Sequence, residues 1–211
     1  MKAEYYSHYG SDNMVADAAR VSFSKEASNY TEEKNAKLIR FLARNNHVTP
    51  FFHPQVTLRM QAPVPIRTQC FKSKIGFAEN EESRRYIKSE PRFYVPETFR
   101  SAPEGNIKQG SGETHSNNGY WKREYYEYCN KGMMLYKQMI EDNVCPEQAR
   151  FVLPQGTEVE WFWTGSLAAY ARFYNLRNDS HAQKEVQILS EQVGRIVSEL
   201  FPISWKYLTE G

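Results

Sequence analysis

The chain has 211 residues, 40% of them hydrophobic, so residues 1–211 can bury a sizeable core as a single domain. Its 27 basic and 25 acidic residues give a net charge of +2, which is too even for a protein that holds duplex DNA mainly through the phosphates. Three cysteines without metal-ligand or redox spacing, and no signal peptide or long apolar run, lead us to expect a soluble cytoplasmic protein. We expect reduced thiols, no metal site, no nucleic-acid partner and no membrane contact.

The first third of the chain alternates helix and strand patterns. Apolar residues at helical spacing predict a helix over residues 13–21, and Thr31 is the expected N-cap of a second helix. Strict alternation of apolar and polar residues predicts a half-buried strand over residues 55–62. A short helix is then expected over residues 65–74, with Gly76 ending it.

The middle of the chain is poorer in apolar residues. We expect a second strand at residues 92–95, followed by a mobile loop around residues 101–119, which are rich in Gly, Ser and Asn. A long aromatic-rich helix is expected over residues 121–141. Its Tyr and Trp side chains favour a core or a subunit interface over base stacking, because basic residues are not interleaved with them.

The last third again combines helices with a strand. A short helix is expected to open at Pro146 and to carry Arg150, and residues 158–164 alternate as a strand expects, with Trp161 and Trp163 offering apolar surface for an interface. Ser166 is the expected cap of the following helix. The elements together predict an α/β (α+β) fold with a central antiparallel or mixed sheet flanked by helices.

Residues 177–185 gather a cation, an acid, an imidazole and an amide. Ser180 and Gln183 have the spacing of a capping box, which predicts a helix that begins near His181. Arg177 and His181 would then lie at the N–H-rich end of that helix, where an anionic ligand is favoured. The alternative is an ordinary surface ion pair between Arg177 and Asp179.

A second polar cluster covers residues 67–86. Arg85 could bind a phosphate through two hydrogen bonds and Ser83 could donate a third, although a charge run of this kind can equally be a solvated face. Nothing in the sequence places a general base beside Ser83, so we do not expect it to act as a nucleophile.

Five ordered segments of the chain resemble the motifs of the flavin-dependent thymidylate synthases, the ThyX family. They are Ala18-Ala19-Arg20-Val21-Ser22-Phe23, His47-Val48-Thr49-Pro50-Phe51, the stretch from Gln69 to Asn80-Glu81-Glu82-Ser83-Arg84-Arg85-Tyr86, Ala149-Arg150-Phe151-Val152-Leu153-Pro154, and Asn175-Leu176-Arg177-Asn178-Asp179-Ser180-His181-Ala182-Gln183. The resemblance covers nearly the whole chain. It implies a homotetramer with FAD at the subunit junctions, in which dUMP is methylated by 5,10-methylenetetrahydrofolate and NADPH supplies the hydride.

The resemblance also implies roles for individual residues. Arg177 would be catalytic, because a fixed guanidinium near the pyrimidine ring would stabilise negative charge developing there. The dUMP site would be lined by Gln69, Lys72, Glu81, Glu82, Ser83, Arg84, Arg85, Arg150 and Arg177. FAD would be contacted by Ser22, Thr49, Lys72, Ser73, Lys74, Ser166, Arg172 and His181. His47 would lie near the folate or the nicotinamide.

The chain departs from the family pattern at the expected cofactor site. Lys72-Ser73-Lys74 stands where the family has Arg-His-Arg, and the spacing from there to Asn80 is one residue longer. Two alternatives therefore stay open: a related flavoenzyme that modifies another pyrimidine nucleotide or makes a hydroxymethyl product, and a non-catalytic nucleotide-binding homologue. The sequence does not decide the pyrimidine substrate or the choice between NADPH and NADH.

Overall fold

A computed structural model describes residues 1–105 and 110–210 of the chain. In chain order its elements are β1 (Lys2–Tyr9), α1 (Asp12–Arg20), η1 (Val21–Phe23), η2 (Ala27–Asn29), α2 (Glu32–Arg44), η3 (Thr49–Phe52), β2 (Gln55–Pro63), α3 (Val64–Cys70), β3 (Phe77–Glu81), α4 (Asn118–Glu141), α5 (Pro146–Ala149), η4 (Arg150–Val152), β4 (Glu158–Ser166), α6 (Leu167–Arg177), α7 (Lys184–Leu200) and α8 (Pro202–Thr209), where η marks single turns of 3-10 helix. No helix in the described part of the chain combines the length and the apolar content that crossing a bilayer requires.

The sheet has four strands in the order β1-β2-β4-β3, and every neighbouring pair is antiparallel. The predicted α/β class and the predicted strands at residues 55–62 and 158–164 are confirmed. The strand expected at residues 92–95 is wrong, because that segment makes only a single bridge, between Phe93 and Thr157. The third and fourth strands are β1 and β3 instead.

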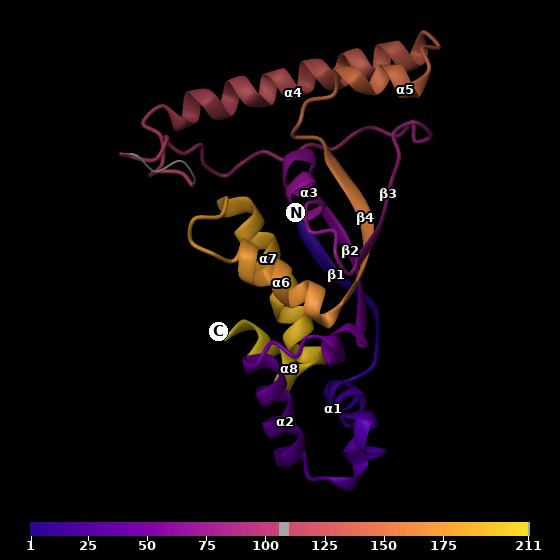
Figure 1. Cartoon of the computed structure of the whole chain (residues 1–211). Coiled ribbons are helices and arrows are strands. Elements are labelled where there is room, and N and C mark those ends of the chain that lie inside the picture. The colour runs from indigo at the N-terminus through magenta and orange to yellow at the C-terminus, as the bar shows by residue number, and fades with distance from the viewer. Residues whose placement is uncertain (106–109, 211) are drawn as a thin grey trace.

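One face of the sheet carries the core. Leu58 and Met60 of β2 pair with Trp163 and Trp161 of β4, and all four side chains are buried. The helices α6, α7 and α8 lie beside the sheet (Figure 1). Helices therefore cover one face rather than flanking both. The expectation that Trp161 and Trp163 offer an exposed interface is wrong, because Phe71 packs edge-on against Trp161 and Phe77 stacks on Trp163 with ring centroids 4.1 Å apart.

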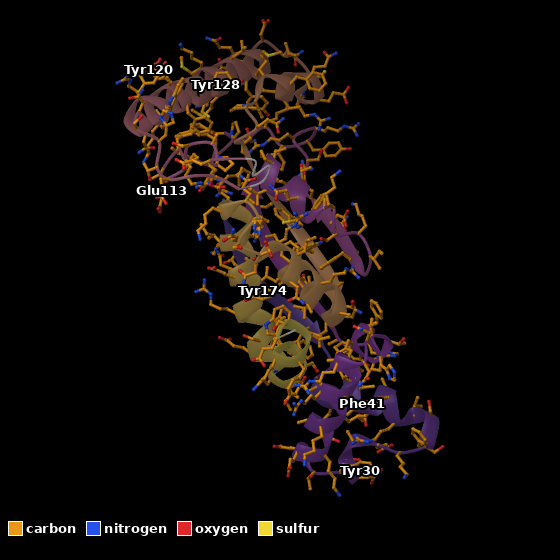
Figure 2. The ribbon with its side chains drawn as sticks, turned by 60° about the vertical axis from the view of Figure 1, so that its left-hand side comes forward. Tyr30, Phe41, Glu113, Tyr120, Tyr128 and Tyr174 are labelled. Atoms are coloured by element: carbon orange, nitrogen blue, oxygen red, sulfur yellow. The ribbon has the colours of Figure 1, made fainter. Side chains whose placement is uncertain are left out.

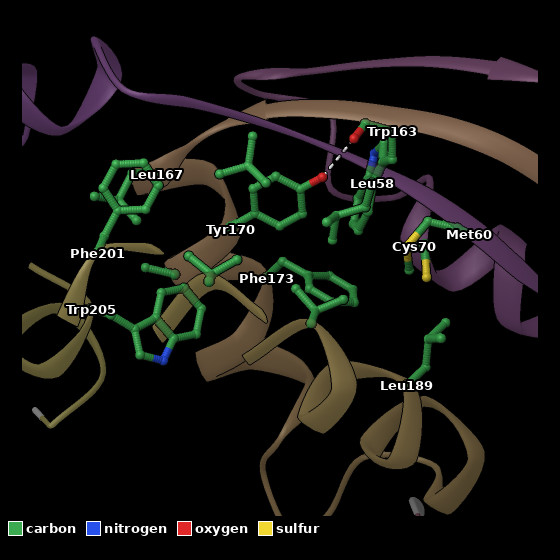
Figure 3. Close-up of a cluster of buried hydrophobic side chains, with 14 of the residues drawn as sticks. Leu58, Met60, Cys70, Trp163, Leu167, Tyr170, Phe173, Leu189, Phe201 and Trp205 are labelled. Carbon is green, nitrogen blue, oxygen red and sulfur yellow. Dashed lines mark hydrogen bonds between the residues drawn. The ribbon is translucent and has the colours of Figure 1, made fainter. Parts of the chain in front are cut away.

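The core is closed by polar contacts as well as by apolar ones. The hydroxyl of Tyr170 on α6 donates to the carbonyl of Trp163, with an oxygen-to-oxygen distance of 2.6 Å, and Cys70 lies near Met60 in the same cluster (Figure 3). Ser166 caps α6 as predicted, because its Oγ accepts from the amide of Ala169. Thr31 likewise caps α2 by accepting from the amide of Lys34.

The helix α4 packs against α5 and η4, and these elements stand apart from the sheet (Figure 1). Figure 2 shows Tyr120 and Tyr128 on α4 at the end of the molecule opposite Tyr30 and Phe41. Most of the large apolar side chains on α4 are exposed: Tyr120, Trp121, Tyr126, Tyr128, Met134 and Leu135. Cys129 and Tyr136 are its buried residues, so the core alternative for the aromatic stripe is wrong within one chain.

The segment that was expected to be a mobile loop is partly described. Residues 106–109 lie outside the described residues. The flanking residues form neither helix nor strand, but a bridge joins Arg100 to Thr114, and the amide of Ser101 donates to the carbonyl of Glu113 over 2.8 Å. The two ends of the loop are therefore close together. The helix α4 starts at Asn118, three residues before the predicted start at residue 121. Its mobility stays a prediction.

Candidate active site

A cavity of about 500 Å³ opens between α3, the segment after β3, and η4. It brings together five of the residues predicted for the nucleotide, namely Glu81, Glu82, Ser83, Arg84 and Arg150. Its wall also includes Val64, Arg67, Phe151, Leu153, Pro154, Gln155, Thr157 and Val159. Residues as far apart in the sequence as Val64 and Val159 thus meet at one concave surface.

Backbone hydrogen bonds fix the acidic and serine side of this cavity. The amide of Glu82 donates to the carbonyl of Glu160 at 2.9 Å, which prolongs the pairing of β3 with β4 by one residue. The chain then turns, because the carbonyl of Ser83 accepts from the amide of Tyr86, and the hydroxyl of Ser83 accepts from the amide of Arg85. The turn places Ser83 and Arg84 at the cavity wall rather than along the strand.

The electrostatics of the cavity are mixed. The Nε of Arg67 lies 2.7 Å from Oε2 of Glu81. Burial raises the pKa of Glu81, the positive charge of Arg67 opposes that shift, and Glu82 adds to it. The two glutamates thus offset part of the charge of Arg67, Arg84 and Arg150. Because the cavity retains three guanidinium groups, it suits a ligand that presents both an anionic group and hydrogen-bond donors.

Two arginines keep a buried donor unused. The Nε atoms of Arg84 and Arg177 are buried, and neither has an acceptor among the residues that the structure describes. A buried guanidinium N–H without an acceptor is costly, so each of these groups is suited to an acceptor supplied by a ligand or another chain.

Gln69 and Arg177 lie outside the cavity. Arg177 is the last residue of α6, and its Nη2 donates to the carbonyl of Gln69 over 3.0 Å. The expectation that Arg177 lies at the N-terminal end of the following helix is therefore wrong. The surface ion pair with Asp179 is not formed either, because Asp179 accepts from both the amide and the ring Nδ1 of His181, and these hydrogen bonds lower its pKa.

The expected capping box at Ser180 and Gln183 is also wrong. The helix α7 begins at Lys184, three residues later than predicted, with Gln183 as its N-cap. The turn made by Asp179 and His181 takes up the intervening residues, and the side chain of Gln183 is bound to Gln69 and Glu185 instead of to a free amide.

The residues predicted for FAD are spread over several elements. Ser22 lies on η1 and Thr49 on η3, both exposed, while the side chain of Lys74 forms an ion pair with Glu79 and stands 5.2 Å from the ring of Phe71. Lys72 is exposed and Ser73 half-buried just after α3. Arg172 donates to the carbonyl of Ile75. His181 lines a second cavity of about 430 Å³ with Ser111 and Lys184.

Three further residues predicted for the nucleotide and cofactor sites lie outside the cavity. Ser166 is only 2% exposed and its hydroxyl is bound in the cap of α6; its contact with FAD stays a prediction. Arg85 is exposed and lies 3.5 Å from a carboxylate oxygen of Glu147. His47 is exposed and packs edge-on against Phe41.

The helix α3 is shorter than predicted. It ends at Cys70, because the amides of Lys72 and Ser73 bond to the carbonyls three residues earlier and tighten the chain into a turn. Gly76 follows with a φ of +81°, and a Cβ there would lie 3.0 Å from both Ser166 Oγ and Ala169 Cβ. The turn therefore brings Gly76, just after the Lys72–Lys74 segment, against the start of α6.

Sequence reasoning missed several residues of the site. Arg67 was recognised as part of a polar cluster but not as a wall of the cavity, where it pairs with Glu81. The pair formed by Arg100 and Glu185 joins residues 85 positions apart, and although Glu185 ends the polar segment 177–185, no motif contains Arg100. Only the folded chain brings them together.

A sheet with helices on one face, and a cavity lined by arginine, serine and glutamate side chains, define an α/β protein with a site suited to a phosphorylated ligand. A family model described as thymidylate synthase complementing protein matches residues 5–203. The chain belongs to that family, and the family predicted from the sequence motifs is confirmed.

Known relatives agree with this assignment. A flavin-dependent thymidylate synthase from Thermotoga neapolitana is 33% identical over 198 residues, which cover 94% of this chain and 85% of that protein. One from Thermosipho africanus is 32% identical over 197 residues, covering 92% and 84%. The crystal structure of the UMP/dUMP methylase PolB from Streptomyces cacaoi, bound with 5-Br dUMP, superposes with a TM-score of 0.90 at 26% identity and covers 99% of this chain and 94% of that one.

Proposed function

We propose that this chain is an FAD-dependent thymidylate synthase, which methylates dUMP to dTMP with 5,10-methylenetetrahydrofolate as carbon donor and NADPH as reductant. One observation carries the proposal: the family match spans residues that line an arginine-rich cavity, and two of the matched arginines, Arg84 and Arg177, keep a buried donor for a ligand. The flavin and the reaction are those named for the relatives.

The side chains divide into two roles under this proposal. Arg84, Arg150 and Ser83 bind the nucleotide phosphate, because guanidinium and hydroxyl donors suit its oxygens. Arg177 faces the pyrimidine ring and stabilises the negative charge that develops there, so that the ring carbon attacks without an enzyme thiolate. FAD, when bound, supplies the hydride-transfer chemistry.

The separation of the two groups supports a shared site. Gln69 and Arg177 lie on α3 and α6, whereas Ser83, Arg84 and Arg150 line the cavity near η4. We propose that one subunit contributes the first group and a neighbouring subunit the second, in the homotetramer expected from the family. The exposed aromatic side chains of α4 offer apolar surface for such contacts. A cytoplasmic location stays a prediction.

The residues present fit FAD in part. Lys72, Lys74, Thr49 and His181 are exposed polar groups that could hold phosphate and ring oxygens. Lys74 is paired with Glu79, and an ammonium group lacks the planar fork of the arginines it replaces. We therefore expect FAD to bind with an affinity that falls when salt is added, because its phosphates are held mainly by point charges.

The flavin is the first thing to test. The purified protein should be yellow, or should become yellow on addition of FAD, and NADPH should bleach the absorption. Titrations at rising salt should then weaken the complex. A colourless protein that takes up no added FAD would refute the proposal of an FAD-dependent enzyme. It would favour a non-catalytic nucleotide-binding homologue instead.

A second candidate substrate is UMP. PolB, the solved relative described above, is named as a methylase of both UMP and dUMP, and a second structure of it bound with 5-Br UMP superposes with a TM-score of 0.88. Parallel assays with UMP and dUMP distinguish the two candidates by their kcat/KM values. The mass of the product also distinguishes methyl transfer from hydroxymethyl transfer.

A further inference from the structure

A chain of hydrogen bonds runs from the base of the 101–117 segment to the last turn of α6. Nη2 of Arg100 lies 2.7 Å from Oε1 and 2.9 Å from Oε2 of Glu185. The side-chain amide of Gln183 donates to Oε2 of the same carboxylate over 2.9 Å. Three side chains from two separate parts of the chain are thereby joined at the start of α7.

The chain continues to α3. The side-chain amide of Gln69 donates to Oε1 of Gln183 over 2.6 Å, and the carbonyl of Gln69 accepts from Nη2 of Arg177. Gln183 therefore uses both ends of its amide group, one toward Glu185 and the other toward Gln69. Arg100, Glu185, Gln183, Gln69 and Arg177 form one continuous series, which we call the Arg100–Arg177 network.

The buried member of the network is Glu185, which is 7% exposed. Burial alone would raise the pKa of Glu185, but hydrogen bonds from Arg100 and Gln183 outweigh it and lower the pKa below the usual range. A buried carboxylate keeps its charge only where donors surround it, so Arg100 and Gln183 have little freedom to point elsewhere. The network is rigid at this end.

The rigidity of the network also restricts the conformation of the Arg177 side chain. An arginine side chain has several rotamers, and holding it in one of them costs conformational entropy unless its surroundings fix it. Its Nη2 is held by Gln69, while its Nε is left for a ligand. Because the acceptor is the backbone carbonyl of Gln69, the direction in which Nε points depends on where the last turn of α3 is held.

We propose that Gln183, Glu185 and Arg100 are positioning residues for Arg177: they anchor the last turn of α3 through the side chain of Gln69, and the backbone carbonyl of Gln69 in turn holds the guanidinium that faces the nucleotide. The inference rests on the proposed function, since it takes Arg177 as the group that meets the pyrimidine. None of the three residues needs to touch the substrate. Each acts through the next member of the Arg100–Arg177 network.

A double-mutant cycle tests this arrangement. Gln183→Ala breaks the network at an exposed residue, so the fold should survive, and Glu185→Gln weakens it further up. In the otherwise unchanged protein, Gln183→Ala should lower kcat with dUMP by about 10- to 100-fold, as expected when a reacting group is misplaced. In an Arg177→Ala background the same change should have less than about a 2-fold effect, because its target is gone.

Two measurements separate positioning from general damage. The dissociation constant of dUMP should rise in Gln183→Ala while KM for NADPH stays the same, and the thermal unfolding midpoint should match that of the control Gln192→Ala. Gln192 is a suitable control because it also lies on α7 and also makes a long-range hydrogen bond, accepting from the amide of Ala3 over 3.0 Å. The control should keep full activity.

Each other outcome overturns the inference. Equal losses from Gln183→Ala in both backgrounds would mean that Gln183 acts independently of Arg177. An unchanged kcat and an unchanged dUMP affinity in Gln183→Ala would mean that the network positions nothing. If Arg177→Ala had no effect on the activity of the flavin-bound protein, the proposed role of Arg177 would be wrong, and the inference would be wrong with it. The Arg177→Ala variant alone distinguishes this result from the two outcomes of Gln183→Ala.

Discussion

Among single residues, Arg177 is suited to the methylation chemistry and the three cysteines are not. Conventional thiolate chemistry is disfavoured, because burial raises the pKa of Cys70 to about 12, with only partial opposition from Arg177, and burial also raises the pKa of Cys129. Cys145 is exposed, but it lies near Gln148 rather than in a cluster of cations. The guanidinium of Arg177, whose buried Nε has no acceptor among the residues that the structure describes, is the better candidate for chemistry.

This contrast gives the first prediction. A variant with Cys70→Ala, Cys129→Ala and Cys145→Ala should keep measurable turnover, whereas Arg177→Ala should slow the chemical step by about 100-fold or more, as loss of a charge-stabilising donor does. Single-turnover measurement of dTMP formation compares the two. A folded cysteine-free protein that makes no product would show that a cysteine is required and would contradict this prediction.

Helices that are distant in the sequence stabilise one another. Asp12, the first residue of α1, accepts from the amides of Ile203 and Ser204 over 2.9 and 2.8 Å, and so caps the N-terminus of α8 from 190 residues away. Asp12→Ala should lower the free energy of unfolding by about 1–2 kcal/mol, which is the usual cost of losing a cap. Urea unfolding beside the exposed control Asp142→Ala measures it, and equal stability of the two variants would contradict the capping.

The open face of the sheet carries a pH-dependent contribution. Burial alone would raise the pKa of Glu160, but hydrogen bonds from Arg59 and Arg92, each 2.6 Å from a carboxylate oxygen, outweigh it and lower the pKa. A lowered pKa stabilises the fold above the unfolded value of about 4.3 and loses that effect as the pH falls through the folded value. Glu160→Gln should therefore lower the unfolding midpoint at pH 7 and flatten its decline below pH 4.3. An unchanged slope would contradict the assignment.

The sequence predicted the elements that have strong periodicity and missed those that depend on pairing. The strands β2 and β4 alternate apolar and polar residues because one face is buried. The edge strand β1 is largely exposed, and β3 is a short polar strand, so neither has an alternation to detect. The helix α7 starts late because Asp179 and His181 form a turn that competes with the capping box.

The site was predictable to the same extent. Family motifs named Ser83, Arg84 and Arg150, and the structure brings these three to one cavity. No motif could show that Gln69 and Arg177 stand apart from them, because that depends on how α3 and α6 pack. The long-range pair of Arg100 and Glu185 was likewise not predictable, since no local pattern links Arg100 to the segment that contains Glu185.

At the level of the whole molecule, we expect one nucleotide site to be assembled from more than one subunit. If Arg177 and Arg85 reach the same nucleotide from different subunits, Arg177→Ala and Arg85→Ala should each be nearly inactive. Partial unfolding, mixing and reassembly should then return a fraction of the activity, because some sites draw an intact arginine from each chain. Differently tagged chains that co-purify as mixed oligomers without regaining activity would show that each site is completed within one chain.

This chain methylates dUMP with the help of a bound flavin. The most direct measurement is the mass of the nucleotide after incubation of the FAD-loaded protein with dUMP, methylenetetrahydrofolate and NADPH, with omission of each component in turn. We predict dTMP in the complete mixture, none when any one component is omitted, and none with Arg177→Ala within the same time. Unchanged dUMP in the complete mixture, or a hydroxymethyl product, would contradict the account.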